Sequence, residues 1–191
     1  MAGTTHDEPM SITAEVLHGL VEKYLAEYPD EWSRLARLSL ALTTRGEPSG
    51  HVTSAVVLID PRWRVLYLHH PGRQRWLLPE AHLTDADDWL PDAALRELYE
   101  RFGIQPDTVA PLPGFEVTPL DIDVHRRPAN RATGRPEHWH FEIRHAFQVA
   151  GTPTIRPDPA DGQPAWLAPD AVPGFALRLK LRAIHQTVTG D

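Results

Sequence analysis

The sequence predicts an α/β (α+β) fold in which a mixed β-sheet lies between helices, as an α/β/α sandwich. An N-terminal helical extension precedes this sandwich in the sequence. Segments with a helical apolar repeat alternate along the chain with segments rich in β-branched residues. Their order is a helix pair, a hairpin, a helix, further strands and a last helix, which suits a mixed sheet between helices. We expect the extension to cover residues 1–49 and the main domain to cover residues 50–191.

The extension is expected to hold two helices. After a disordered start at residues 1–9, Ser11 or Thr13 can cap the first helix. The second is expected from residue 30 or 31 to about residue 43, followed by a linker at residues 44–50. Its predicted apolar side consists of Trp32, Leu35, Leu38 and Leu40. We expect the pair to pack either on the main domain or on a second subunit of a homodimer.

The main domain should begin with a β-hairpin and end with a helix. A helix is expected to end at Gly103, because glycine commonly terminates helices. A loop is expected between residues 76–79 and that helix, and residues 106–115 are expected to form a connection. The other predicted elements are strands at residues 51–60, 64–69, 120–125, 139–149 and 165–167, and a helix at residues 173–185.

Polar side chains alternate along two of these strands. Alternate residues of a strand share a face, so if the two strands are neighbours their polar rows face each other. Imidazoles with carboxylates suit a transition metal, but histidines on a sheet face also simply hydrogen-bond neighbouring acids. The rows can equally line a substrate pocket without metal. The two rows are Asp121, Asp123 and His125, and His138, His140 and Glu142.

Two carboxylates lie about one turn apart on the helix that ends at Gly103. Glu97 and Glu100 are three residues apart, on a different face from the apolar repeat. Carboxylates stacked in this way can hold a divalent cation. Arg101 follows Glu97 by four residues, so its guanidinium can pair with Glu97 and take the place of a cation.

The segment 76–104 resembles the box of the Nudix family, Gly-x5-Glu-x7-Arg-Glu-U-x-Glu-Glu-x-Gly-U, where U is a bulky aliphatic residue. The resemblance implies a Nudix-like α/β/α sandwich whose loop and helix hold Mg²⁺ or Mn²⁺. It also implies that the metal activates water against the diphosphate of a nucleoside diphosphate linked to a group X. The matching residues are Arg96, Glu97, Leu98, Glu100, Gly103 and Ile104.

The box is degenerate. The family's paired glycines are replaced by Glu80 and Ala81, and its first acid falls on Asp88 or, with one extra residue, on Asp87. Arg101 replaces the third acid of the helix, which changes the local charge by two units and is expected to lower metal affinity. Magnesium often keeps several waters and uses one or two carboxylates with substrate phosphates, so weakened and abolished catalysis both stay open.

The resemblance assigns roles residue by residue. Catalysis and metal binding fall to Glu97, Glu100 and Asp88, whereas Arg96 orients the acids by pairing with Asp87 or Asp88. We expect structural roles for Arg96, Arg101 and Gly103. The expected substrate-binding residues are Trp76, Glu80, His82, Asp123, His125, His138 and His140. Two loops could also clamp phosphate through Arg73, Arg75, Arg126, Arg127, Arg131 and Arg135.

Composition limits the classes of partner. The net charge of −7 and the pI near 5.8 argue against binding a nucleic acid polymer. The chain has no cysteine, which excludes disulfides and zinc–thiolate sites. There is no apolar run long enough to span a membrane and no signal sequence at the start, so we expect a cytoplasmic protein that does not bind membranes.

Two functional hypotheses follow. The first is a Nudix-type hydrolase that cleaves a phosphoanhydride bond in a nucleotide-containing small molecule, with activity weakened or altered by the degenerate box. The second is a repurposed Nudix-fold protein that no longer hydrolyses diphosphates. It would be a biosynthetic enzyme for a specialised metabolite or a ligand-binding or regulatory module. The fold alone does not choose between them.

Overall fold

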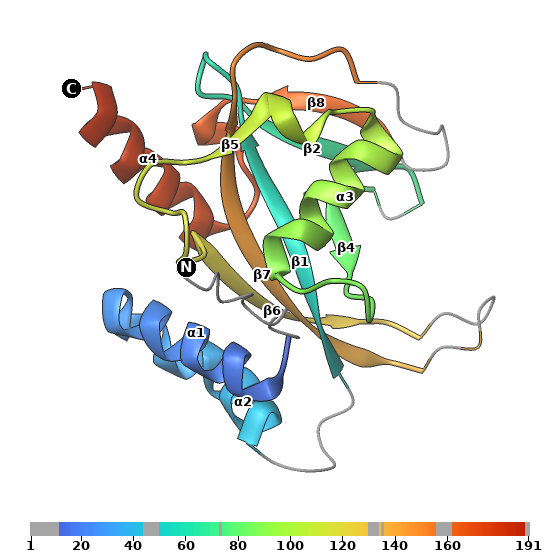
Figure 1. Ribbon diagram of the computed structural model, residues 1–191, viewed down its shortest axis with the longest axis vertical. Helices are drawn as coiled ribbons and strands as arrows, with labels where there is room; N and C mark the ends of the chain where they lie inside the picture. Colours follow the sequence, from blue (N-terminus) through green and yellow to red (C-terminus); the bar gives the residue numbers. More distant parts are fainter. Residues whose placement is uncertain are drawn as a thin grey trace, which may run out of the picture.

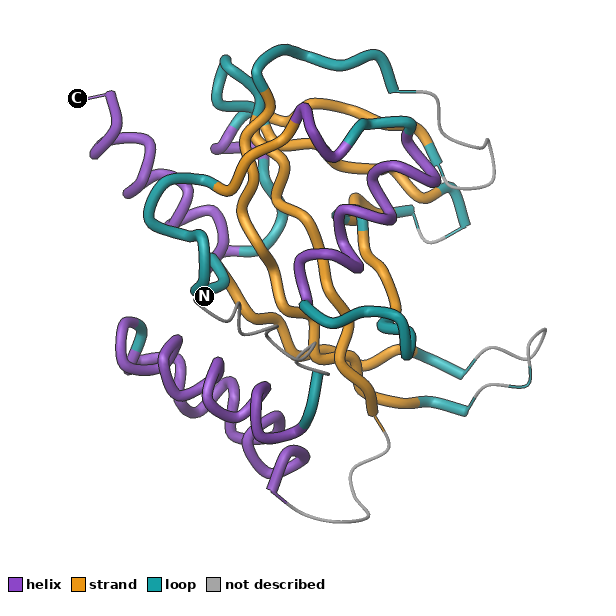
Figure 2. Tube along the Cα trace, viewed as in Figure 1, coloured by secondary structure: helices purple, strands orange, loops and turns teal. Residues whose placement is uncertain are grey.

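A computed structural model describes residues 12–43, 50–72, 74–129, 134, 136–155 and 162–189. In this part of the chain one mixed sheet is flanked by helices (Figure 1; Figure 2). The strands are β1 (Gly50–Ile59), β2 (Val65–His70), β3 (Arg75–Leu77), β4 (Glu80–His82), β5 (Val109–Pro111), β6 (Asp121–Arg127), β7 (His138–Val149) and β8 (Gln163–Leu167). The helices are α1 (Ala14–Glu27), α2 (Trp32–Thr43), α3 (Leu90–Phe102) and α4 (Phe175–Thr189), with 3-10 turns at Pro29–Glu31, Pro106–Thr108 and Pro169–Ala171.

The parallel pair β1 and β7 forms the centre of the sheet. The strand order is β3-β2-β1-β7-β5, with β4 paired to β1, β6 to β7 and β8 to β2. The register places His51 opposite His140 and Thr53 opposite Glu142. Because β6 runs antiparallel to β7 with His125 opposite His140, these side chains all belong to one face of the sheet.

The two faces of the sheet are covered by different helices. On one face Val57 of β1 packs with Leu177 and Leu181 of α4. On the other face Val56 and Leu58 pack with α3. Figure 1 shows α3 and α4 on opposite sides of the sheet. The helices α1 and α2 share a third core cluster with Ile122, Phe141 and Ile143, which belong to the face that α3 covers.

The predicted fold class is confirmed, and so are the helix pair, the hairpin and the closing edge strand at residues 165–167. The helix pair packs on the main sheet. The prediction missed the three-residue strands β3, β4 and β5, which are too short for a strand repeat to appear in the sequence. The predicted disordered start, all of the linker except Gly50, and Arg73, Arg131 and Arg135 lie outside the described residues.

The predicted apolar side of α2 is wrong at two positions. Trp32 and Leu40 are 63% and 58% exposed, whereas Leu35 and Leu38 are buried. At about 100° per residue, Leu40 lies about 200° around the helix from Leu38, and Trp32 lies about 120° from it. The stripe that contacts the sheet is therefore narrower than the sequence suggested.

A buried ion network joins the helical extension to the sheet and to α4. Asp121 of β6 is 1% exposed. It accepts hydrogen bonds from Arg144 and Lys180, both at 2.8 Å, and from Arg34 at 3.2 Å. Burial acts to raise the pKa of Asp121, but the charges of Arg144 and Lys180 outweigh it and hold that pKa below its usual value. Lys180 also contacts Glu31 at 2.8 Å, so elements far apart in the sequence share these charges.

No helix in the described ranges is both long and apolar enough to cross a membrane.

Removing the charge of Asp121 should destabilise the fold strongly. Asp121→Asn leaves the surrounding cations without their carboxylate, and breaking a buried pair in this way costs about 3–5 kcal/mol. The matched control is Asp170→Asn, which breaks the exposed Asp170–Arg182 pair and should cost less than about 1 kcal/mol. Urea unfolding measures both free energies, and equal losses would contradict the assigned role of the network.

His145 should make the stability depend on pH. It is buried on β7, and burial lowers its pKa from 6.5 to about 4. The unfolded chain therefore binds this proton more tightly, and stability is lost as the pH falls from about 6.5 to about 4. Between about pH 7.5 and about pH 5, the wild type should lose about 2 kcal/mol of unfolding free energy more than His145→Leu.

Urea unfolding at the two pH values checks this difference. His18→Leu, on the outer part of α1, is the control and should follow the wild type. Parallel losses in the wild type and His145→Leu would show that His145 is not held in its neutral form.

Candidate functional site

The polar side chains of four strands come together on the face of the sheet opposite α3. The two rows predicted on β6 and β7 do face each other, because the strands pair with Asp123 opposite Glu142 and His125 opposite His140. β4 adds Glu80 and His82 to the same face through its pairing with β1. The sequence did not indicate that β1 adds His51 as well, next to His140.

A cavity of about 510 Å³ opens over part of this face, near the turn that precedes α4. Trp76 forms part of its wall and stands edge-on to His69, with ring centroids 5.0 Å apart. Charged groups of both signs line the cavity. They are Glu80, Asp123 and Glu142, with Arg75, Arg127 and Arg144, and His125 lies among them. Of the predicted substrate-binding residues, Trp76, Glu80, Asp123 and His125 thus share one cavity.

Arg144 organises the acids at one end of the cavity. Its guanidinium donates to Glu142 at 2.8 Å and to Asp123 at 3.0 Å. Burial acts to raise the pKa of Asp123, but its hydrogen bond with His125 and the charge of Arg144 lower that pKa to about 2. Burial raises the pKa of Glu142. For His125, burial opposes protonation, but the hydrogen bond with Asp123, 3.1 Å away, prevails and raises the pKa. At this end of the cavity, the carboxylates of Asp123 and Glu142 are therefore neutralised by the guanidinium of Arg144.

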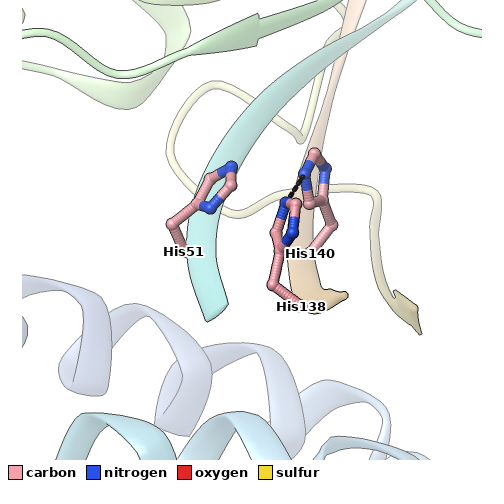
Figure 3. Close-up of side chains that lie close together, drawn as sticks. All are labelled: His51, His138 and His140. Carbon is pink, nitrogen blue, oxygen red and sulfur yellow. Dashed lines mark hydrogen bonds between the residues drawn. The ribbon is translucent and has the colours of Figure 1, made fainter. Parts of the chain in front are cut away.

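The histidines gather at the other end of the polar face. His51, His138 and His140 each bring one ring nitrogen within 4.8 Å of the others, and Figure 3 shows their rings turned toward one another. The ring of His82 lies 4.9 Å from that of His51. His51, His82 and His138 line a second, more open hollow of about 680 Å³. Burial and the neighbouring imidazoles of His140, His82 and His138 lower the pKa of His51 to about 4.

Glu80 connects the cavity with the histidines. Its carboxylate contacts Nδ1 of His140 at 2.7 Å and accepts a hydrogen bond from Arg127. Burial would raise the pKa of Glu80, but the hydrogen bond with His140 lowers it, so the carboxylate is ionised. Nε of Arg127 also points its hydrogen at Nδ1 of His140, at 3.2 Å. The two contacts compete, because this nitrogen either donates to Glu80 or accepts from Arg127. The contact with the carboxylate is the shorter one, and a lone pair facing a carboxylate would be repelled, so we assign the hydrogen of His140 to Nδ1.

The box helix α3 lies on the other face. Gly103 ends it in a left-handed conformation with φ of 68°, which glycine adopts without strain. The amide of Gly103 donates to the carbonyl of Tyr99, and that of Ile104 to the carbonyl of Leu98, both at 3.0 Å. Leu98 and Phe102 pack in the core, which leaves the acids of the helix directed elsewhere.

The charged residues of the box are largely paired with one another. Arg101 donates to Glu97, the ion pair that the sequence suggested. Arg96 donates to Asp87, which also accepts from the amide of Thr84 at 2.7 Å. Burial would raise the pKa of Asp87, but its hydrogen bond from Arg96 lowers it.

The other two predicted metal ligands are placed apart. Glu100 is exposed on α3. Asp88 is also exposed and lines a separate hollow with Trp89 and the α1 residues Glu15 and Lys23. Within the described ranges, Glu97, Glu100 and Asp88 do not form a group of three with ligand atoms within 4.8 Å of one another. Arg96 of α3 also donates to the backbone carbonyl of His82 at 3.3 Å, which joins the helix to the end of β4.

The NUDIX domain family matches residues 50–189 of the chain. No curated protein sequence matches it. Among solved structures it is similar to a Caenorhabditis elegans Ap4A hydrolase binary complex, with 12% identity, a TM-score of 0.54 and coverage of 73% of this chain and 98% of that one. It is also similar to RenU, a Nudix hydrolase from M. smegmatis, with 17% identity, a TM-score of 0.51 and coverage of 73% and 88%. At these identities the likeness concerns the fold.

Proposed function

Because this chain belongs to the NUDIX domain family, whose hydrolases generally act on nucleoside diphosphates linked to a group X, we propose that it hydrolyses a phosphoanhydride bond of such a compound at a weakened box. Two features support the proposal. Glu97 and Glu100 keep the helical spacing of the family's acids. A cavity of about 510 Å³ on the polar face has the size of a small-molecule site.

The family's metal fits these residues only if the substrate helps to hold it. Asp87 is bound by Arg96 and Thr84, and Arg101 stands beside Glu97. The carboxylates that remain suit a magnesium or manganese ion that keeps most of its water ligands and also binds the phosphates of the substrate, which are typical ligands of Mg²⁺. When bound, such an ion would activate water and neutralise the diphosphate. Glu97 and Glu100 would hold it from the helix.

The Glu97–Arg101 pair is the observation on which the proposed weakness rests. The side chain of Glu97 is 12% exposed, so its charge is poorly screened and its guanidinium partner is held firmly. A dication that approaches Glu97 meets the repulsion of Arg101 and must displace it. In the proposed reaction, Arg101 would pair with the phosphates of the substrate, and the carboxylate of Glu97 would be released to hold the ion.

The cavity would receive the nucleoside or the X group. Trp76 offers an aromatic face to a base, and Arg75, exposed at the rim, offers a cation to a phosphate. The remaining charges that line the cavity pair mainly with one another, so they would provide shape and hydrogen bonds to the ligand rather than net charge.

A second candidate is a Nudix-fold protein that binds a ligand, or acts in the synthesis of a specialised metabolite, without hydrolysing diphosphates. The Glu97–Arg101 pair favours this alternative too, because it already provides the charge that a metal would neutralise. Under this alternative, the cavity and the histidines on the polar face would carry the function.

A charge reversal on the box helix distinguishes the two candidates. The full chain is assayed for phosphoanhydride cleavage with Mg²⁺ and Mn²⁺ against dinucleoside polyphosphates and nucleoside diphosphate sugars. Arg101→Glu restores a third acid and should raise kcat/KM by about 10-fold, equal to about 1.4 kcal/mol of transition-state stabilisation. Glu100→Gln should remove the activity.

The matched control is Arg182→Glu, the same charge change on α4 in an exposed ion pair. It should leave kcat/KM unchanged. Absence of turnover in both the wild type and Arg101→Glu, or full activity in Glu100→Gln, would reject hydrolysis at the box and favour the second candidate.

A further inference from the structure

We propose that His51, His138 and His140 form a zinc site on the face of the sheet opposite α3, separate from the acids of the box. The three residues come from two parallel strands, β1 and β7, whose register holds His51 beside His140. Each contributes one ring nitrogen to a group within 4.8 Å (Figure 3). Neutral imidazole is a preferred ligand of zinc, and sites of three histidines with a fourth, open position are well suited to it.

The hydrogen bonds of the rings decide where their lone pairs point. Nδ1 of His138 lies 2.8 Å from the carbonyl oxygen of Pro136, which can only accept, so this nitrogen carries a hydrogen. Nδ1 of His140 also carries a hydrogen, which it donates to the carboxylate of Glu80 at 2.7 Å. In each neutral ring the other nitrogen, Nε2, then holds a lone pair.

These two lone pairs meet. Nε2 of His138 lies 3.2 Å from Nε2 of His140, so two acceptors face each other unless a proton or a metal ion lies between them. Nε2 of His51 is also buried, and it has no hydrogen-bond partner among the described residues. The cluster thus presents three imidazoles with unused nitrogen atoms in one small region.

The spacing suits tetrahedral coordination. With Zn–N bonds of about 2.0–2.1 Å, two ligand nitrogens of a tetrahedral site lie about 3.3 Å apart. The Nε2 atoms of His138 and His140 are already 3.2 Å apart. The ring centroid of His51 lies 4.4 Å from that of His140, so a side-chain rotation can complete the set. The fourth position would face the hollow that His51, His82 and His138 line.

Glu80 and Arg127 complete the surroundings of the site. A carboxylate on the far nitrogen of a ligand histidine fixes its tautomer and makes it a stronger ligand, and Glu80 holds His140 in this way. The positive charge closest to the cluster is that of Arg127, and the carboxylate of Glu80 offsets it through an ion pair. Glu80 is therefore a positioning residue for the proposed ion.

A second group also has the spacing of a metal site, namely Asp123, His125 and Glu142. Its carboxylates are already neutralised by a guanidinium. Arg144 donates to both of its carboxylates. A dication there would have to displace a buried guanidinium. No cation of the described residues lies between the three rings of the histidine cluster, and Arg127, which contacts His140 at its far nitrogen, is paired with Glu80. For this reason we assign the metal to the histidine cluster.

Metal binding is tested on the full chain without an affinity tag, after treatment with a chelator. Cobalt(II) serves as the spectroscopic probe, because a tetrahedral nitrogen site gives it visible absorption, and zinc is titrated in competition. We expect one cobalt per chain, displaced by zinc. His138→Ala and His51→Ala should remove the absorption, and Glu80→Gln should weaken binding about 10- to 100-fold.

The controls separate this site from the alternatives. His18→Ala on α1 should bind as the wild type does, and so should Glu100→Gln and His125→Ala. Absence of binding would overturn the proposal and leave a shared proton between the rings of His138 and His140. Binding that survives in His138→Ala, or that is lost in Glu100→Gln or His125→Ala, would also overturn it. Thermal unfolding of each variant shows whether a lost signal reflects lost structure, and His138→Asn provides a second, milder change.

Discussion

The parallel pairing of β1 with β7 is the constraint on which both faces of the molecule depend. Because side chains alternate along a strand, this register places His51, His140 and Glu142 together on one face and Phe141 and Ile143 on the other. A slip of one residue would exchange the two sets. The core beneath α1 and α2 would then receive buried charges, and the polar face would lose its groups. Packing of the core therefore enforces the geometry of the site.

Charge pairing is the second constraint, and it follows from the first. A face that brings Asp121, Asp123 and Glu142 into partial or complete burial is stable only if cations accompany them. Arg144 contacts all three, and Lys180 and Arg34 reach Asp121 from elements outside the central pair of strands. The helical extension is thus attached to the sheet both by apolar packing and by these ion pairs.

The sequence predicted the features that depend on local repeats. The helices, the rows on β6 and β7 and the Glu97–Arg101 pair all follow from spacings of two to four residues, and the structure contains them. The position of His51 beside His140 could not be predicted from the sequence, because it depends on a parallel pairing between strands that are far apart along the chain. For the same reason the roles of Arg127 and Arg144 as partners of the acids were missed, although the alternation of β7 placed Arg144 on the face of Glu142.

At two places among the described residues, an arginine neutralises carboxylates that would otherwise be available to a cation. On α3, Arg101 neutralises Glu97, and on the sheet, Arg144 neutralises Asp123 and Glu142. A fixed guanidinium holds carboxylates in place without an exchangeable ion, but it offers no open coordination position for water or substrate. The cluster of His51, His138 and His140 is different, since Glu80 and the carbonyl of Pro136 orient its rings and the neighbouring cation, Arg127, is paired with Glu80. If this protein uses a metal that it binds without substrate, electrostatics favour the histidine face over the box helix as its location.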